Sequence, residues 1–415
     1  MTARSISWCA FAALAAAFIF MLAVCAGCVK CDPPTDLTGY EKPFGVVSAE
    51  APSPPKSFNV FIDASRSMYG FTAPNSKFHD IINSVISRIP QDAKIQLYAF
   101  GRSSVELEGD LRKMMHTLSD RNFYSQTHTD LCKPFDEHIQ SDPNSVNLII
   151  TDMVQSTEYA AQDRAIFARL LRQYLGEDGF LSLMATQADF QGDYYTEKAP
   201  STIKVGDAST RPLYCLAFGN RKFSKFVQDK IGTLFEHSFE FGTTSENKLE
   251  RADNSDRRDD PESFIFERND EDLPVSEFIL KKGHTDYLKV AMSGYEDRFG
   301  KTLDYAVAYK GKADSIYTEL NGAGGMIQAD SLGDDGRVSF KVPFNNNDPG
   351  EYIVRLTFRK TLPGWIHQLN TDDDTKAENL NKTYMLEPWM RFIMDNFEDY
   401  KHLATTQYYL YICRK

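Results

Sequence analysis

The sequence predicts a two-domain protein in which a doubly wound α/β domain is followed by an all-β sandwich. Up to about residue 242, apolar runs of strand length alternate with segments of helical periodicity. A strongly polar stretch follows, and beyond it short strands recur without helices between them. A chain of 415 residues is long enough for two separate cores.

The first 27 residues resemble a bacterial export signal, with one arginine ahead of a long uncharged apolar run. The run ends in LAVCAGC, where a small Ala26–Gly27 pair before Cys28 is similar to a lipoprotein signal, in which the cysteine is acylated after cleavage. Two alternatives stay open, lipidation at Cys25 and an uncleaved anchor, since lipoprotein signals usually have Leu at the position of Cys25 and the run nearly spans a bilayer. In each case we expect an exported protein anchored to the membrane, at the periplasmic face or the cell surface.

Residues 28–55 predict a flexible tether, because they are rich in Pro, Ser and Thr and lack apolar periodicity. Residues 56–242 predict a mostly parallel sheet covered by helices on both faces, since buried strands and amphipathic helices alternate there. Pro90 and Gly176 end two of these helices. The expected strands are Phe58–Ile62, Lys94–Phe100, Val146–Ile150, Leu181–Thr186 and Leu213–Phe218.

Residues 243–263 are almost entirely polar and predict a linker. Residues 264–360 predict an antiparallel sandwich, because short strands are separated by turn residues. Within them, Asp348–Phe358 resembles the penultimate-strand corner of immunoglobulin-like domains, in which the hydroxyl of a tyrosine, here Tyr352, bonds back to the backbone. Residues 361–415 contain an aromatic helix and a final aromatic strand, and we expect them to form a short C-terminal cap on the second domain.

Polar side chains gather at one predicted edge of the first sheet. Asp63, Ser65 and Ser67 follow the first strand, Thr129 precedes a helix, and Asp152 ends the central strand. In an open parallel sheet the carboxyl ends of the strands meet at one edge, where ligands bind. We therefore expect these five side chains to converge.

This set resembles the von Willebrand factor type A domain and its metal-ion-dependent adhesion site, which combines a D-x-S-x-S loop, a distant Thr and a later Asp. The resemblance covers residues 56–242 and implies a Rossmann-like sheet with one Mg²⁺ or Mn²⁺ ion. It implies that the hydroxyls of Ser65, Ser67 and Thr129 contact the ion, while Asp63 and Asp152 supply negative charge through bound waters. An acidic residue on a partner protein would then complete the coordination.

The chain departs from the family pattern at two places. The family usually has glycines before the threonine and often one after the later aspartate, whereas this chain has Ser125–His128 and Met153. Stiffer loops leave Thr127 as an alternative to Thr129. A purely structural alternative is that Asp63 and its neighbouring serines only cap the following helix.

The composition argues against nucleic-acid binding, because a net charge of -12 provides no basic surplus to neutralise phosphates. We expect a non-catalytic, membrane-tethered module that binds a protein partner in a metal-dependent way. One alternative is a scaffold of an envelope assembly with a degenerate metal site. Another is a hydrolase that uses Ser65, Ser67 or metal-activated water, but the chain lacks a G-x-S-x-G motif and a histidine placed as a base.

The remaining candidates have structural explanations. Cys215 lies within an apolar run and is expected to be buried. Cys132 and Cys413 form a candidate disulfide, although the cysteine spacing matches no zinc site or disulfide framework. Asp372–Asp374 lacks the spacing of a calcium-binding loop and predicts a solvated loop.

Overall fold

The computed structural model describes residues 31–44, 53–72, 76–139, 144–155, 160–176, 178–199, 201–241, 249–251, 264–269, 275–280, 287–292, 299–311, 314–332, 338–344, 348–397 and 405–414. The predicted export signal, including Cys25 and Cys28, lies outside these residues. In the described ranges, no helix has the length and apolar character needed to cross a membrane.

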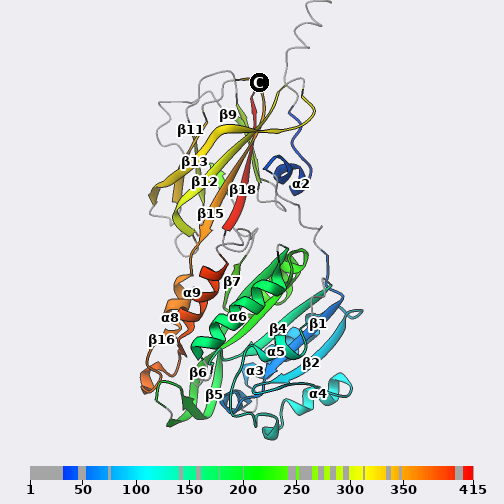
Figure 1. Ribbon diagram of the computed structural model, residues 1–415, viewed down its shortest axis with the longest axis vertical. Coiled ribbons are helices and arrows are strands. Elements are labelled where there is room, and N and C mark those ends of the chain that lie inside the picture. Colours follow the sequence, from blue (N-terminus) through cyan, green and yellow to red (C-terminus); the bar gives the residue numbers. More distant parts are fainter. Residues whose placement is uncertain are drawn as a thin grey trace, which may run out of the picture.

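The first domain is a seven-stranded sheet between two layers of helices (Figure 1). Its strands are β1 (Ser57–Asp63), β2 (Lys94–Phe100), β3 (Ser104–Glu106), β4 (Ser145–Thr151), β5 (Gly179–Thr196), β6 (Ser201–Asn220) and β7 (His237–Phe241). They lie in the order β3-β2-β1-β4-β6-β5-β7. The mixed α/β class predicted for this part of the chain is therefore present.

The sheet is less parallel than predicted. Only the β1–β2 and β1–β4 pairings are parallel, while β6 runs antiparallel to both β4 and β5. The described residues between the two predicted strands, 187–199 and 201–212, form no helix and instead extend both strands into one long hairpin. A hairpin returns the chain directly beside the strand it has left, so β6 enters the sheet in the opposite direction to β4.

Helices cover both faces of this sheet. One face packs against α3 (Lys77–Arg88), α4 (Leu111–Thr117) and α7 (Ser224–Lys230), and the other against α5 (Lys133–Glu137), α6 (Ala160–Leu175) and α9 (Leu386–Asn396). Along β1 the buried side chains alternate, with Val60 and Ile62 in one core and Phe61 in the other. This is why the strand reads as a continuous apolar run in the sequence. The connections contain the short helices η2 (Arg66–Thr72), η3 (Arg121–Phe123), η4 (Arg221–Phe223) and η5 (Gly232–Leu234).

The second domain is a nine-stranded sheet that folds over on itself. Its strands are β8 (Leu249–Arg251), β9 (Phe264–Asn269), β10 (Val275–Leu280), β11 (Tyr287–Met292), β12 (Phe299–Gly311), β13 (Thr318–Leu332), β14 (Val338–Pro343), β15 (Gly350–Lys360) and β18 (Thr405–Arg414), in the order β8-β11-β14-β13-β12-β15-β18-β10-β9. The long β13 pairs with β12 over its first part and with β14 over its last part. Side chains of β11 and β14 share one core with β12, β15 and β18, so two layers pack face to face.

Two sequence expectations can be compared with this domain directly. The hydroxyl of Tyr352 donates to the backbone carbonyl of Asp348, which is the bond predicted from the corner motif. The predicted linker, 243–263, contains the strand β8 at one edge of the sheet, and its other residues lie outside the described ranges.

The C-terminal helix does not cap the second domain as predicted, whereas the final strand does belong to that domain. The helices α8 (Gly364–Gln368) and α9 lie against the first domain (Figure 1). There the ring of Trp389 packs edge-on to Phe167, with 5.4 Å between the ring centroids. The final strand, β18, lies between β15 and β10 inside the second sheet. The chain therefore enters the second domain, returns to the first after β15, and ends in the second. The returning segment also contains β16 (Asn370–Thr371), η6 (Ala377–Asn379) and β17 (Thr383–Tyr384).

Part of the predicted flexible tether is packed against the second domain. Residues 31–44 include α2 (Leu37–Glu41) and η1 (Lys42–Phe44), and the side chain of Tyr40 is buried beside Tyr409. The aromatic side chains of Tyr40 and Phe44, which lie in the predicted tether, thus cover apolar surface of the second domain. The carboxylate of Glu41 also lies 3.5 Å from the guanidinium of Arg221, which belongs to the first domain.

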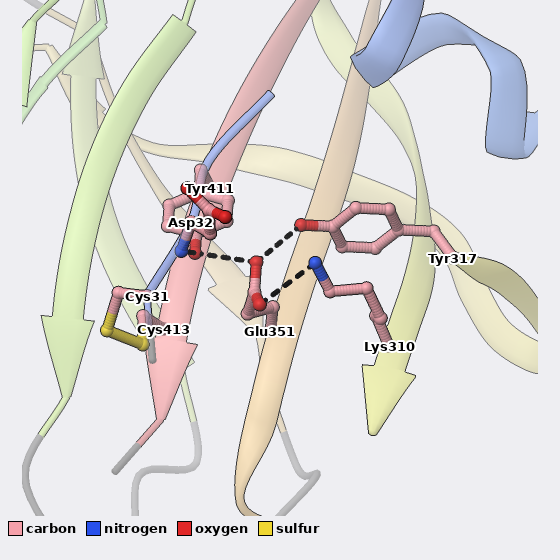
Figure 2. The surroundings of a disulfide bond; sticks show 7 residues. All are labelled: Cys31, Asp32, Lys310, Tyr317, Glu351, Tyr411 and Cys413. Atoms are coloured by element: carbon pink, nitrogen blue, oxygen red, sulfur yellow. Dashed lines mark hydrogen bonds and ion pairs between the residues drawn. A yellow bond between two sulfur atoms is a disulfide. The ribbon is translucent and has the colours of Figure 1, made fainter. Parts of the chain in front are cut away.

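A disulfide joins Cys31 to Cys413, with 5.6 Å between the Cα atoms (Figure 2). The candidate pairing of Cys132 with Cys413 is therefore wrong. Cys132 and Cys215 are buried and form no disulfide. Buried cysteines of this kind pack as small apolar side chains.

Beside the disulfide, Glu351 joins three segments of the chain (Figure 2). Its carboxylate accepts hydrogen bonds from the hydroxyls of Tyr317 and Tyr411, both at 2.8 Å, and lies 2.9 Å from the ammonium of Lys310. The hydroxyl of Tyr411 in turn accepts a hydrogen bond from the backbone amide of Asp32 at 3.0 Å. The N-terminal segment is thus held by polar contacts as well as by the covalent bond.

Candidate metal centre

The five predicted site residues lie together at the carboxyl ends of β1 and β4. Asp63 is the last residue of β1, and Asp152 directly follows β4. Ser65 and Ser67 lie where the chain leaves β1, and Thr129 approaches from the loop before α5. Asp63, Asp152, Ser65 and Thr129 are buried, whereas Ser67 is half-buried.

The carboxylate of Asp63 is held by donors on both oxygens. Its Oδ1 accepts from the backbone amide of Ser65 at 2.9 Å. Its Oδ2 accepts from the hydroxyls of Thr129 at 3.1 Å and Thr151 at 2.8 Å. These bonds fix the orientation of Asp63 and join β1, β4 and the loop before α5 around one carboxylate. The helix-capping alternative does not account for this convergence of separate segments.

The hydroxyls of Ser65 and Ser67 lie 3.0 Å apart. A hydroxyl has one donor and two acceptor lone pairs, so each can bond to a neighbour and still present a lone pair elsewhere. The alternating spacing in D-x-S-x-S therefore places two neutral hydroxyl oxygens side by side.

A short backbone pairing brings Thr129 to the site. The amide of Arg66 donates to the carbonyl of Gln126 at 2.9 Å, and the amide of Gln126 donates to the carbonyl of Ala64 at 3.1 Å. Thr129 then reaches Asp63, while Thr127 is exposed and bonds to the ring of His128. Of the two threonines left open by the sequence, Thr129 is the one that contacts the site.

Asp152 is buried and only partly hydrogen-bonded. Its Oδ1 accepts from the amide of Val154 at 3.1 Å, while its Oδ2 has no hydrogen-bond partner among the described residues. The next residue, Met153, has a φ of 58°. This left-handed conformation suits glycine and costs a larger residue roughly 1–2 kcal/mol. The backbone at Met153 thus adopts, at some strain, a conformation that glycine takes more readily.

The electrostatics of the two carboxylates favour a nearby cation. Burial, together with the negative charge of Asp152, raises the pKa of Asp63 to about 7, against the hydrogen bonds from Ser65 and Thr151 that lower it. Burial also raises the pKa of Asp152, while the positive charge of Arg211, the Val154 amide and the Ser67 hydroxyl lower it. Two buried acids that resist ionisation together are stabilised as carboxylates by an added positive charge.

The donor set fits a small, hard divalent ion. Mg²⁺ and Mn²⁺ prefer oxygen ligands, and all the side chains that converge here present oxygen. Within the described ranges, no three His, Cys, Asp or Glu side chains group as a metal site, so two carboxylates and three hydroxyls would have to suffice. The unpartnered Oδ2 of Asp152 and the hydroxyls of Ser65 and Ser67 are the oxygens best able to hold such an ion, directly or through water.

Sequence reasoning missed two residues of this site, Thr151 and Arg211. Thr151 precedes Asp152 and is visible in the motif VNLIITD, but only the fold shows that its hydroxyl faces Asp63. Arg211 lies on β6 with no exposed surface. A charged residue at the start of the apolar run in STRPLYCLAF was the available signal for a buried arginine.

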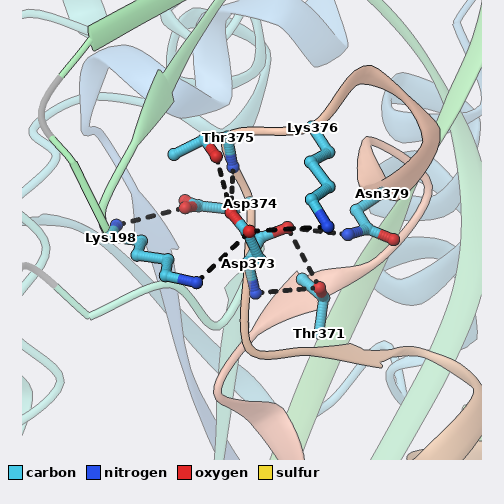
Figure 3. A network of polar contacts seen from close by, with 7 residues as sticks. All are labelled: Lys198, Thr371, Asp373, Asp374, Thr375, Lys376 and Asn379. Carbon is cyan, nitrogen blue, oxygen red and sulfur yellow. Dashed lines mark hydrogen bonds and ion pairs between the residues drawn. The ribbon is translucent and has the colours of Figure 1, made fainter.

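The loop between β16 and β17 is bound to the first domain rather than solvated as predicted (Figure 3). Asp372 is exposed, but Asp374 is buried and accepts hydrogen bonds from the hydroxyl of Tyr194 and from the amides of Glu197 and Lys198. The carboxylate of Asp373 lies 3.2 Å from the ammonium of Lys198. These contacts bind Asp373 and Asp374 to the first domain at β5 and the turn that follows it.

The end of this loop and the start of β17 contact residues of the candidate metal centre. The hydroxyl of Thr383 lies 3.0 Å from that of Tyr214 and 3.5 Å from the carbonyl of Asp152. The carbonyl of Leu380 accepts a hydrogen bond from Arg211 at 2.7 Å. Residues from the far end of the chain therefore help to position both Asp152 and Arg211.

A scan of the chain against protein-family models finds no match. A search of the curated proteins finds no significantly similar sequence.

Proposed function

We propose that the protein is a membrane-tethered, non-catalytic binding module of the bacterial cell envelope, built on a von Willebrand factor type A domain and an immunoglobulin-like sandwich. Asp63, Ser65, Ser67, Thr129 and Asp152 would hold Mg²⁺ or Mn²⁺. The bound ion would offer an open coordination position to an acidic group on a partner protein.

The observation that carries this proposal is the convergence of five oxygen-bearing side chains from three separate segments on one edge of the sheet. Asp63 is already satisfied by hydrogen bonds and would orient its neighbours, while the hydroxyls of Ser65 and Ser67 stay available. Neutral hydroxyls in direct contact with the ion bring no negative charge to its coordination shell, which favours an external carboxylate as a further ligand.

Two further features are compatible with the proposed location. The disulfide between Cys31 and Cys413 suits an oxidising compartment such as the bacterial periplasm or cell surface. The N-terminal apolar run, which lies outside the described residues, supplies the anchor in this proposal, with Cys28 as the lipidated residue.

Capture of a partner from an envelope extract tests the proposed function. The purified full-length protein is immobilised, and we expect it to retain at least one envelope protein in Mg²⁺ and to release it in EDTA. Asp152→Asn should abolish this capture, because it removes a buried carboxylate of the site. Asp372→Asn is the matched control, since it makes the same chemical change at an exposed position outside the site. Equal capture with and without the metal would contradict the proposal.

A structural scaffold is the second candidate, and one observation favours it. A buried positive charge, Arg211, already lowers the pKa of Asp152 without any metal. In a scaffold with a degenerate site, Arg211 would take the place of the ion and the second domain would make the contacts. Capture that persists in EDTA and in Asp152→Asn would support this alternative.

A further inference from the structure

Arg211 is an unusual residue to find inside the first domain, because its side chain is completely buried. One guanidinium nitrogen, Nη1, donates to the carbonyl of Leu380 at 2.7 Å. The guanidinium also lies over the ring of Tyr194, with 3.8 Å between its carbon and the ring centroid. Its Nε and Nη2 have no hydrogen-bond partner among the described residues.

A buried guanidinium needs a compensating negative charge, because transfer of an unpaired ion from water into a protein interior costs several kcal/mol. Among the groups that lower the pKa of Asp152, the positive charge of Arg211 has the largest effect. Both residues are held by the same short segment, Arg211 through the carbonyl of Leu380 and Asp152 through the hydroxyl of Thr383. The two groups thus form one buried charge cluster together with Asp63.

The presence of Arg211 changes the charge balance of the proposed metal site. Asp63 and Asp152 alone would neutralise a divalent cation, and an added partner carboxylate would leave the cluster negative. With Arg211 included, the cluster that contains the ion keeps one positive charge, and one partner carboxylate neutralises it. In a buried site such a difference is large, because Coulomb interactions are weakly screened there.

We propose that Arg211 is a fixed counter-charge that weakens the binding of the divalent ion by Asp63 and Asp152 and strengthens the binding of a partner carboxylate once the ion is present. This inference rests on the proposed function, and it assigns to Arg211 the role of a specificity-determining residue. It acts through charge and not as a ligand of the ion.

The test measures Mn²⁺ affinity by electron paramagnetic resonance in the full chain, purified in detergent. Arg211→Met removes the charge and keeps an extended apolar side chain over Tyr194, and it should bind Mn²⁺ about tenfold more tightly than the wild type. Arg211→Lys keeps the charge and should stay within about threefold of the wild type. Tyr194→Phe, which loses the hydroxyl bound to Asp374 but keeps the ring and the charge, controls for altered packing.

A second measurement uses acetate as the carboxylate probe and does not depend on a variant folding. Acetate should tighten Mn²⁺ binding by the wild type severalfold, since the loaded cluster is positive, and should have no such effect on Arg211→Met. If Arg211→Met gives no cooperative unfolding transition, Arg211→Gln replaces it. An acetate-insensitive wild type overturns the inference even if neither variant folds.

The outcomes separate this inference from the proposed function. If the wild type and Arg211→Met bind Mn²⁺ equally, the inference is overturned and the proposed function stands. If only Arg211→Met binds Mn²⁺, Arg211 is confirmed as a counter-charge, and the proposed function fails because the natural site excludes the ion. If neither protein binds Mn²⁺, both are overturned.

Discussion

Replacing Asp152 with alanine is expected to abolish the stabilisation of the protein by Mg²⁺. Asp152 carries a buried carboxylate oxygen, Oδ2, that has no hydrogen-bond partner among the described residues. At a Mg²⁺ concentration about 100 times the dissociation constant, binding to the folded wild type should add about 2.7 kcal/mol to the free energy of unfolding. The variant should gain nothing, and thermal unfolding in Mg²⁺ and in EDTA measures the difference.

The quantity to compare is the metal-induced shift within each protein, because Asp152→Ala also changes the stability of the metal-free protein. Removal of the Asp152 carboxylate leaves the buried charge of Arg211 with less negative charge nearby, which by itself destabilises the fold. Asp372→Ala removes an exposed carboxylate and should keep the full Mg²⁺ shift. An undiminished shift in Asp152→Ala would show that any bound Mg²⁺ lies elsewhere.

Removing the disulfide should destabilise the second domain by about 3–5 kcal/mol. The bond connects residues 382 positions apart, so it closes a loop of almost the whole chain and strongly restricts the unfolded state. It also holds the segment 31–44, whose Tyr40 covers the core beside Tyr409. Urea unfolding of the wild type and of Cys31→Ser/Cys413→Ser, monitored by far-UV circular dichroism, measures the loss in the free energy of unfolding.

Reduction of the wild type provides the matched control for this prediction. A thiol reductant should lower the stability of the wild type to that of the double variant and should leave the variant unchanged. Cys132 and Cys215 are buried thiols and contribute no disulfide to this comparison. A wild type whose unfolding is insensitive to the reductant would contradict the prediction.

The parts of the fold that follow local patterns could be predicted from the sequence. β1, β2 and β4 are apolar runs buried on both faces, and such runs are recognisable because each side chain has a core to enter. The hairpin of β5 and β6 was not predicted, since periodicity shows that a strand exists but not the direction in which it enters a sheet.

The long-range features could not be read from the sequence. The apolar face of α9 identified it as a packed helix, but nothing in its residues shows whether it covers the first or the second domain. Residues 31–44 have the composition of a tether, yet they are docked by two aromatic residues, a disulfide-bonded cysteine and polar contacts of Asp32 and Glu41. Pairing among cysteines likewise depends on distances that only the fold defines.

The site was predictable to the extent that it follows strand ends. Asp63 and Asp152 lie where the carboxyl ends of neighbouring parallel strands must meet. Arg211 was missed because β6 runs antiparallel and brings its middle, rather than its end, toward Asp152. The contribution of Leu380 and Thr383 was missed because their loop belongs to a segment that returns from the second domain.

Anomalous diffraction from crystals soaked in Mn²⁺ tests the central claim most directly, since it locates the ion independently of any activity. We expect one strong peak at the carboxyl ends of β1 and β4, bounded by the hydroxyls of Ser65 and Ser67 and by the carboxylate of Asp152. No peak at this position in a crystal that leaves the edge open to solvent, or Mn²⁺ bound only at other residues, would contradict the account.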